Sequence, residues 1–228
     1  MTKRTWLWMG MFGCATMLGV LMILVLRSGP MNAAPTQTAT LAATDVVVPG
    51  PVEVGEPVDW DQPGPYLQIV VAGEANGTIT IDLAETVAPE HVAQITALAE
   101  SGAYNGVVFH RVLDGFMAQT GDVRFGRVGP DMGSAGMGGS DRPDIKAEFS
   151  DVPFDRGIVG MARSQKPDSA NSQFFIMFDA GHFLNGQYTV IGRVTGGMDI
   201  VDKIKRGAPK SGAVAETPDV MQSVTISQ

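Results

Sequence analysis

The chain has 228 residues, a formal net charge of −8 and one cysteine, Cys14. A single cysteine cannot form an intramolecular disulfide or a cysteine-based metal site, so the fold has to be stabilised by packing. The charges are spread along the chain, and no lysine- or arginine-rich stretch offers the basic surface that nucleic acid requires. The composition therefore predicts one folded domain of ordinary size that does not bind nucleic acid.

The first 27 residues form a hydrophobic segment that we predict to lie outside the folded domain. Lys3 and Arg4 precede a run of 21 uncharged residues from Trp6 to Leu26, and Arg27 closes it. A helix of that length reaches about 31 Å, close to the thickness of the hydrocarbon core of a bilayer. Positive charge before the span predicts a cytoplasmic N-terminus and an exported C-terminal domain.

A cleaved secretory signal peptide is the alternative interpretation of residues 1–27. The apolar stretch of a signal peptide is usually ~7–15 residues long and is followed by small residues at the cleavage site. Asn32-Ala33-Ala34 is a poor match, because asparagine is the first of the three and Pro35 follows the expected cut. We therefore expect a helical anchor in the inner membrane with the domain in the periplasm, and keep a periplasmic or secreted protein as the alternative. A buried core helix is less favoured, since the segment has no polar face.

Residues 28–64 differ in composition from the segments on either side. They include six prolines and five acidic residues, and no lysine or arginine. Such a segment cannot bury enough apolar surface to offset the entropy lost on ordering, and its prolines favour extended conformations. We predict a linker, with the alternative that Val46–Val48 docks as an edge strand.

Residues 65–228 contain short β-rich segments separated by turn residues, which predicts an all-β barrel or sandwich. Asn76-Gly77 predicts a two-residue hairpin turn, because both residues tolerate positive φ. The expected strands are Tyr66–Val71, Thr78–Leu83, Val107–Val112, Phe174–Phe178, Tyr188–Val194 and Ser223–Ser227.

Two segments of this domain have helical periodicity. In the first, Pro89 suits an opening turn, Val92, Ile95 and Leu98 share one face, and Gly102 favours a C-terminal stop. The second is Met198–Ile204, in which apolar residues recur every three positions. A β domain with two peripheral helices indicates a barrel whose open ends the helices cover.

One stretch of the domain carries a specific resemblance. The sequence FHRVLDGFMAQTGD at Phe109–Asp122 closely resembles the cyclophilin signature FHRV-x-x-GFM-x-Q-x-GD. Three further segments follow in the order found in that family: Met161–Arg163, Asn171–Ile176 and Phe183–Gly192. The resemblance covers essentially all of residues 65–228. It implies a peptidyl-prolyl cis/trans isomerase folded as a closed eight-stranded antiparallel β-barrel capped by two α-helices.

The resemblance also implies a role for individual residues. Arg111 matches the catalytic arginine, and Gln119 matches a polar residue that positions it. The walls of the proline pocket are expected from Phe116, Met117, Phe175 and Leu184. The full set of expected substrate-binding residues is Phe116, Met117, Ala162, Arg163, Gln173, Phe175, Phe183, Leu184 and Tyr188.

The chemistry of prolyl isomerisation fits an arginine at the centre of the site. Rotation about the X–Pro bond faces a barrier of about 18–20 kcal/mol, because the amide C–N bond has partial double-bond character. No covalent bond breaks, so the sequence predicts neither a cofactor nor a metal. A guanidinium such as that of Arg111 can donate to the prolyl nitrogen as the nitrogen regains its lone pair.

The site departs from the best-known members of the family at three positions. Phe183 stands where many eukaryotic cyclophilins have tryptophan, Tyr188 replaces histidine, and Arg163 replaces asparagine. All three resemble bacterial members and imply weak cyclosporin binding with isomerase activity retained. We expect the backbone of Arg163 to pair with the substrate and its side chain to meet acidic substrate residues.

The predicted function is isomerisation of X–Pro bonds in exported proteins during folding. The expected partners are proline-containing polypeptides, and the membrane through the N-terminal helix; the protein is expected to be a monomer. A non-catalytic proline-peptide binding chaperone or scaffold at the membrane is the alternative. His110 alternates in direction with Arg111 along a strand and is therefore interpreted as structural.

Overall fold

The structure is a computed structural model that describes residues 64–228. The predicted membrane segment at 1–27, and the linker up to residue 63, lie outside the described residues. Among residues 64–228, no helix combines the length and the apolar character that crossing a membrane requires.

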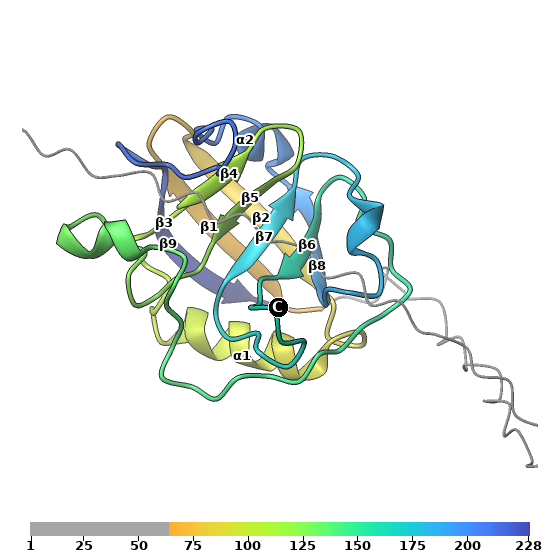
Figure 1. Cartoon of the computed structure of the whole chain (residues 1–228). Coiled ribbons are helices and arrows are strands. Elements are labelled where there is room, and N and C mark those ends of the chain that lie inside the picture. The colour runs from red at the N-terminus through yellow and green to blue at the C-terminus, as the bar shows by residue number, and fades with distance from the viewer. Residues whose placement is uncertain (1–63) are drawn as a thin grey trace, which may run out of the picture. The chain divides into compact units, whose positions relative to one another are not determined.

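Residues 64–228 fold into one curled antiparallel sheet with helices at its ends (Figure 1). The elements in chain order are β1 (Tyr66–Ala72), β2 (Gly77–Leu83), α1 (Pro89–Glu100), β3 (Val107–Val108), β4 (Arg111–Leu113), β5 (Met117–Thr120), a 3-10 turn η1 (Pro130–Ser134), β6 (Ile158–Met161), β7 (Phe174–Met177), a 3-10 turn η2 (His182–Leu184), β8 (Val190–Gly196), α2 (Met198–Val201) and β9 (Val220–Ser227).

The prediction of a closed eight-stranded barrel is wrong in both number and closure. The described sheet has nine strands in the order β3-β9-β1-β2-β8-β6-β7-β5-β4, so β3 and β4 are its two edges. These two strands follow one another along the chain, within the segment Val107–Val112 that the sequence predicted as a single strand. Phe109 and His110 separate them, because their backbone groups bond to Asp219 and Val214 respectively. The sheet therefore curls into an open half-barrel.

The hairpin of β1 and β2 is antiparallel, as predicted, with Tyr66 opposite Asp82 and Val71 opposite Gly77. The predicted two-residue turn is wrong, since the loop spans residues 73–76. The buried carboxylate of Asp219 accepts a hydrogen bond from Ala75 N at 2.8 Å and so holds this loop from outside the hairpin. A side chain on another segment thus replaces the local turn geometry on which the prediction relied.

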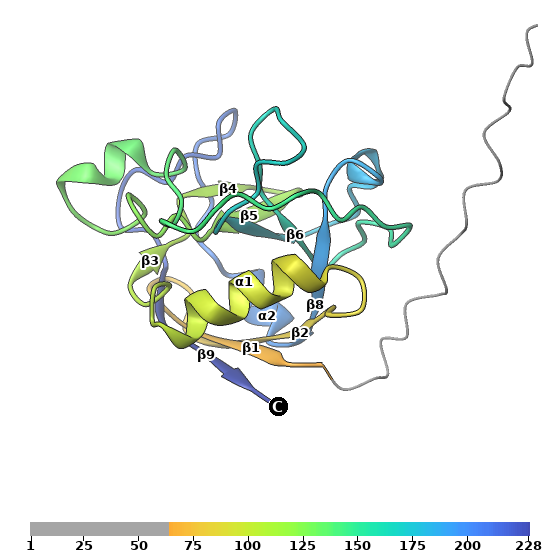
Figure 2. The same cartoon turned by 90° about the horizontal axis from the view of Figure 1, so that it is seen from below.

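The two helices lie at opposite ends of the curled sheet (Figure 1). Helix α1 begins at Pro89 and buries Val92, Ile95 and Leu98, as the periodicity predicted. It lies across one open end, between β1, β2 and β9 on one side and β4, β5 and β6 on the other (Figure 2). Helix α2 is shorter than predicted, although Ile204 beyond its end is still buried.

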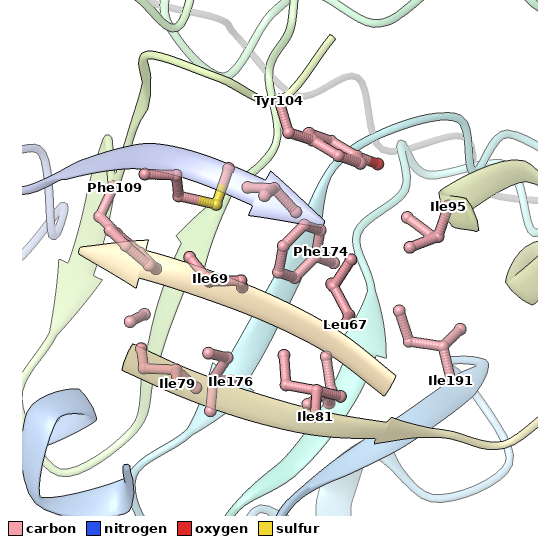
Figure 3. Close-up of a cluster of buried hydrophobic side chains, with 14 of the residues drawn as sticks. Leu67, Ile69, Ile79, Ile81, Ile95, Tyr104, Phe109, Phe174, Ile176 and Ile191 are labelled. Carbon is pink, nitrogen blue, oxygen red and sulfur yellow. The ribbon is translucent and has the colours of Figure 1, made fainter. Parts of the chain in front are cut away.

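Buried apolar side chains form two separate clusters. The first fills the interior of the curled sheet and includes Leu67, Ile69, Ile79, Ile81, Ile95, Tyr104, Phe109, Phe174, Ile176 and Ile191 (Figure 3). The second, which we call the outer cluster, consists of Met117, Val152, Phe154, Ile158, Phe175, Met177, Leu184 and Val190. Adjacent residues Phe174 and Phe175 belong to different clusters, because side chains alternate between the two faces of a strand. The outer cluster underlies the residues predicted to bind substrate.

Candidate active site

Strand register places three of the predicted residues in one row. Arg111 on β4 lies opposite Gln119 on β5, and Gln119 lies opposite Phe175 on β7. Directly opposed residues share a face of the sheet, so their side chains project to the same side. The neighbouring strands β4, β5 and β7 can be followed in Figure 1. Residues separated by up to 64 positions in the chain are thereby brought together.

Arg111 is half-buried and is oriented by neutral partners. Its Nη1 donates to Gln119 Oε1 at 3.2 Å and lies 3.8 Å from the sulfur of Met117, and its Nε donates to the Ser211 carbonyl oxygen at 3.2 Å. Burial lowers the pKa of Arg111 below its ordinary value, and Tyr188 has a smaller, opposite effect on this pKa. No ion pair involves Arg111 within the described part of the chain. The guanidinium therefore keeps its charge and has no carboxylate to neutralise it.

A chain of hydrogen bonds links Arg111 to the loop that follows β5. Gln119 Nε2 donates to Gln173 Oε1 at 2.9 Å, which fixes the amide that accepts from Arg111. Gln173 Nε2 in turn donates to the carbonyl oxygens of Gly136 at 3.1 Å and Gly138 at 2.7 Å. The orientation of the guanidinium thus depends on a loop far from Arg111 in the sequence.

Asp122 organises that loop and is a residue whose role the sequence analysis missed. Its carboxylate is fully buried and accepts four backbone N–H groups. Oδ1 accepts from Arg124 at 3.1 Å and Phe125 at 2.9 Å, and Oδ2 accepts from Gly136 at 2.8 Å and Gly138 at 2.9 Å. The signature stretch ends on this aspartate. Its position at the end of a strand, as a buried acidic residue, is the signal that could have identified it.

The predicted walls of the proline pocket belong to the outer cluster. Met117, Phe175 and Leu184 are buried members of it, and Phe116 packs against its edge. The rings of Phe116 and Phe183 lie 5.4 Å apart at an angle of 35°, although 67% of Phe183 is exposed. Apolar side chains on or next to β5, β7 and η2 thus gather on the same face as Arg111, and we call this group of four side chains, Phe116, Met117, Phe175 and Leu184, the apolar slot.

A cavity of about 510 Å³ adjoins this row of residues. Its lining includes four predicted residues, Gln119, Ala162, Arg163 and Gln173, but not Phe116, Met117 or Leu184. The site therefore has two parts, an apolar slot and a more polar cavity, which meet at the two glutamines. Met137, which the sequence analysis did not single out, lies at the cavity with 82% of its side chain exposed.

His110 lies beneath the loop held by Asp122 and is only 6% exposed. Neither ring nitrogen makes a hydrogen bond of good geometry among the described residues, although the Val108 backbone and the Gln173 side chain are near enough to raise the pKa of the imidazole. Burial lowers the pKa of His110 from its ordinary value of 6.5, and this outweighs the opposing influence of Asp122. The imidazole is therefore neutral at pH 7, as befits the structural role that the sequence indicated.

We expect the free energy of unfolding to fall as pH decreases below about 6.5. In that range the unfolded chain protonates His110 while the folded state does not, so protons favour unfolding. His110→Gln should flatten this part of the pH dependence in urea unfolding curves. An unchanged slope in His110→Gln would contradict the prediction.

Within residues 64–228, no group of three or more histidine, cysteine, aspartate or glutamate residues is arranged to hold a metal ion. The chemical features of the site are instead a positioned, uncompensated guanidinium, an apolar slot beside it and a polar cavity. Together they indicate a protein with a ligand-binding site on the outside of a curled β-sheet.

Comparison with known proteins names this class. The family described as cyclophilin type peptidyl-prolyl cis-trans isomerase/CLD matches residues 66–227. A probable peptidyl-prolyl cis-trans isomerase of Brucella suis is 59% identical over 153 residues, which cover 66% of this chain and 78% of that protein. The chain belongs to the cyclophilin-type peptidyl-prolyl isomerases. It is accordingly a peptidyl-prolyl cis/trans isomerase, and its mainly β fold is the cyclophilin fold.

Solved structures agree with this assignment. A cyclophilin from Hirschia baltica is 27% identical, with a TM-score of 0.58, and the match covers 74% of each chain. A cyclophilin-type isomerase from Cryptosporidium parvum, crystallised in the presence of the dipeptide Ala-Pro, is 25% identical with a TM-score of 0.60. That match covers 72% of this chain and 99% of the other.

Proposed function

We propose that the enzyme isomerises X–Pro bonds in exported proteins and that Arg111 is its catalytic residue. The catalytic assignment rests on the position of this guanidinium. Gln119 holds it beside the apolar slot, and it forms no ion pair within the described residues. The fold matches an isomerase from Cryptosporidium parvum studied with Ala-Pro, which supports a proline-containing peptide as the substrate.

Arg111 acts by favouring the twisted amide over the planar one. In the planar ground state the prolyl nitrogen shares its lone pair with the carbonyl group and accepts hydrogen bonds poorly. As the bond rotates, the lone pair returns to nitrogen, and an N–H of Arg111 donates to it. An interaction that strengthens only in the transition state lowers the barrier, and each 1.4 kcal/mol gained raises the rate about tenfold.

Neutral partners suit this role better than a carboxylate. Gln119 accepts from Arg111 through its amide oxygen and donates through its amide nitrogen to Gln173, and neither glutamine carries a charge that would weaken the field of the guanidinium. A fixed dipole held by further hydrogen bonds needs no reorganisation when the amide twists. The two glutamines therefore fix the direction of Arg111 without reducing its charge.

The apolar slot holds the proline ring while the preceding carbonyl rotates. Phe116, Met117, Phe175 and Leu184 supply carbon surface on one side of Arg111 and exclude water from it. In a less polar medium the hydrogen bond from the guanidinium is stronger. Residues on either side of the proline extend along the surface, toward the adjoining cavity at Gln119 and Gln173.

The location of the enzyme is inferred from its sequence. The apolar run from Trp6 to Leu26, preceded by Lys3 and Arg4, supports an inner-membrane anchor with a periplasmic domain, and the linker up to residue 64 would hold the domain away from the bilayer. Newly exported polypeptides with prolines are then its substrates, and the enzyme acts as a monomer.

The test of this location uses the full-length chain in cells of its source. Protease added to spheroplasts with intact inner membranes should degrade the domain, and a cytoplasmic marker should survive. The mass of the purified native protein should equal that of the complete chain if the anchor is retained, or of a chain starting near Pro35 if a signal peptide is removed. Protection of the domain until the inner membrane is broken would refute export.

A further inference from the structure

The guanidinium of Arg163 is engaged by the protein itself. Its Nε and Nη2 both donate to the Gln187 carbonyl oxygen, at 3.0 and 2.8 Å, and its Nη1 donates to the Ser164 carbonyl oxygen at 2.9 Å. Two edges of the planar group are therefore occupied by backbone oxygens. This geometry is at odds with the expectation that the side chain of Arg163 meets acidic residues of the substrate.

The face of the same guanidinium covers an aromatic ring. The central carbon of Arg163 lies 4.4 Å from the centroid of the Tyr188 ring, within the range of a cation–π interaction. Tyr188 in turn meets Phe175 edge to face at 5.9 Å, and Phe175 stacks on Phe154 at 5.8 Å. Four side chains thus form a continuous series from the protein surface to the floor of the apolar slot.

Tyr188 also lies close to the catalytic group. It contributes electrostatically to raising the pKa of Arg111, against the larger effect of burial. Phe175, which touches the Tyr188 ring, lies opposite Gln119 in the sheet register. Tyr188 is therefore the part of the pocket wall that stands between Arg163 and Arg111.

The segment that carries Tyr188 is also held by a hydrogen bond from Phe154 N to Asn185 Oδ1 at 2.9 Å. Residues 185–187 are exposed, and Gln187 N and Tyr188 N both donate to the Leu184 carbonyl oxygen within the same turn, at 3.0 and 3.2 Å. Arg163, which lies just beyond β6, bonds to Gln187 and stacks on Tyr188. It thereby joins this turn to a separate strand of the sheet.

We propose that Arg163 is a positioning residue, which fixes Tyr188 as the wall of the proline pocket facing Arg111 and so sets how tightly every peptide binds, whatever its charge. The proposal rests on the function proposed for Arg111 and the pocket. Lysine cannot replace arginine in this role, because an ammonium group has neither a planar face to stack nor a fork to span two carbonyl oxygens.

The kinetic test compares Arg163→Lys and Arg163→Ala in the full-length protein. Two proline peptides are used that differ only in an acidic or a neutral residue before the X–Pro pair. We expect KM to rise about five- to tenfold for both peptides in both variants, and kcat to change less than about threefold. If only the acidic peptide loses affinity in Arg163→Ala, and Arg163→Lys restores it, Arg163 binds substrate charge and the proposal is overturned.

A matched control removes a similar contact elsewhere. Arg206 lies 3.9 Å from the centroid of the Phe178 ring, and Phe178 belongs to the interior cluster rather than to the pocket. Arg206→Lys should lower the melting temperature without raising KM. An equal rise in KM in this control would mean that any loss of a stacked arginine loosens the site, which would also overturn the proposal.

A spectroscopic readout tests the contact independently of activity. The Nε–H resonance of Arg163 in 1H–15N NMR spectra should be displaced by the ring current of Tyr188. Tyr188→Leu should abolish the displacement, and the conservative Tyr188→Phe, which retains an aromatic ring, should keep it. If the chemical shift of this resonance is unchanged in Tyr188→Leu, the positioning role is refuted. An inactive wild-type enzyme with the displaced resonance would instead count against the proposed catalysis alone.

Discussion

Replacing Arg111 with alanine should lower kcat/KM for a proline peptide by about 10²–10³-fold, the cost of removing one donor aimed at a transition state. The loss should lie mainly in kcat, since the donor interacts weakly with the planar amide. Arg111→Lys should recover only part of the rate, because an ammonium lacks the rigid planar fork through which Gln119 and Ser211 orient the guanidinium. Arg111 is half-buried and forms no ion pair within residues 64–228, so the melting temperature should change little.

The measurement is NMR exchange spectroscopy of an Ala-Pro peptide, in which cis and trans resonances interconvert faster when the enzyme is added in catalytic amounts. Binding is measured in the same samples by titrating peptide against labelled protein. Near wild-type exchange in Arg111→Ala would refute the assignment. Retained binding without exchange would show that the slot holds proline and that the guanidinium performs the rotation step.

Asp122→Asn should damage both stability and activity, although it changes only one atom type. Each carboxylate oxygen of Asp122 accepts two backbone N–H groups, and an asparagine can offer only one oxygen. Its NH₂ group would face two donors within a buried site. We expect the free energy of unfolding to fall by about 2–5 kcal/mol, as when buried donors lose their acceptor.

The activity of Asp122→Asn should fall about 10²-fold at a temperature where the protein is still folded. The loop at Gly136 and Gly138 holds Gln173, which orients Gln119 and through it Arg111, and a displacement of about 1 Å at the reacting group can have this effect. Asp141→Asn, which alters an exposed acid paired with Arg124, is the control and should behave as wild type. A normal kcat in folded Asp122→Asn would show that the loop does not contribute to catalysis.

Local patterns in the sequence predicted the helices and strands in which apolar residues recur at regular spacing. Helix α1 follows its apolar periodicity from Pro89 onward, and each predicted strand overlaps an observed one. Strands β5 and β6 were missed, because Met117–Thr120 and Ile158–Met161 are short and buried with little alternation. The break at Phe109 could not be predicted either, since it depends on a hydrogen bond to Asp219, more than a hundred residues away.

The residues of the site were predicted from a resemblance. The contacts that orient them could be identified only from the structure. The signature supplied Arg111, Gln119 and Phe175, and the register brings these three into one row. The side chain of Arg163 illustrates the limit: a positive charge beside a binding groove suggests an acidic ligand, but carbonyl oxygens and an aromatic ring already occupy it. The sequence shows that a residue is charged. Which groups that residue contacts depends on how distant segments of the chain are placed in the fold.

The position of the last strand in the sheet has a consequence for biosynthesis. Strand β9 lies between β1 and β3, and Val224 pairs with Ile69 from the opposite end of the domain. Until β9 has left the ribosome, β1 and β3 lack the strand that joins them, and such long-range pairing forms slowly. The curled sheet should therefore be completed only once Val220–Ser227 have emerged.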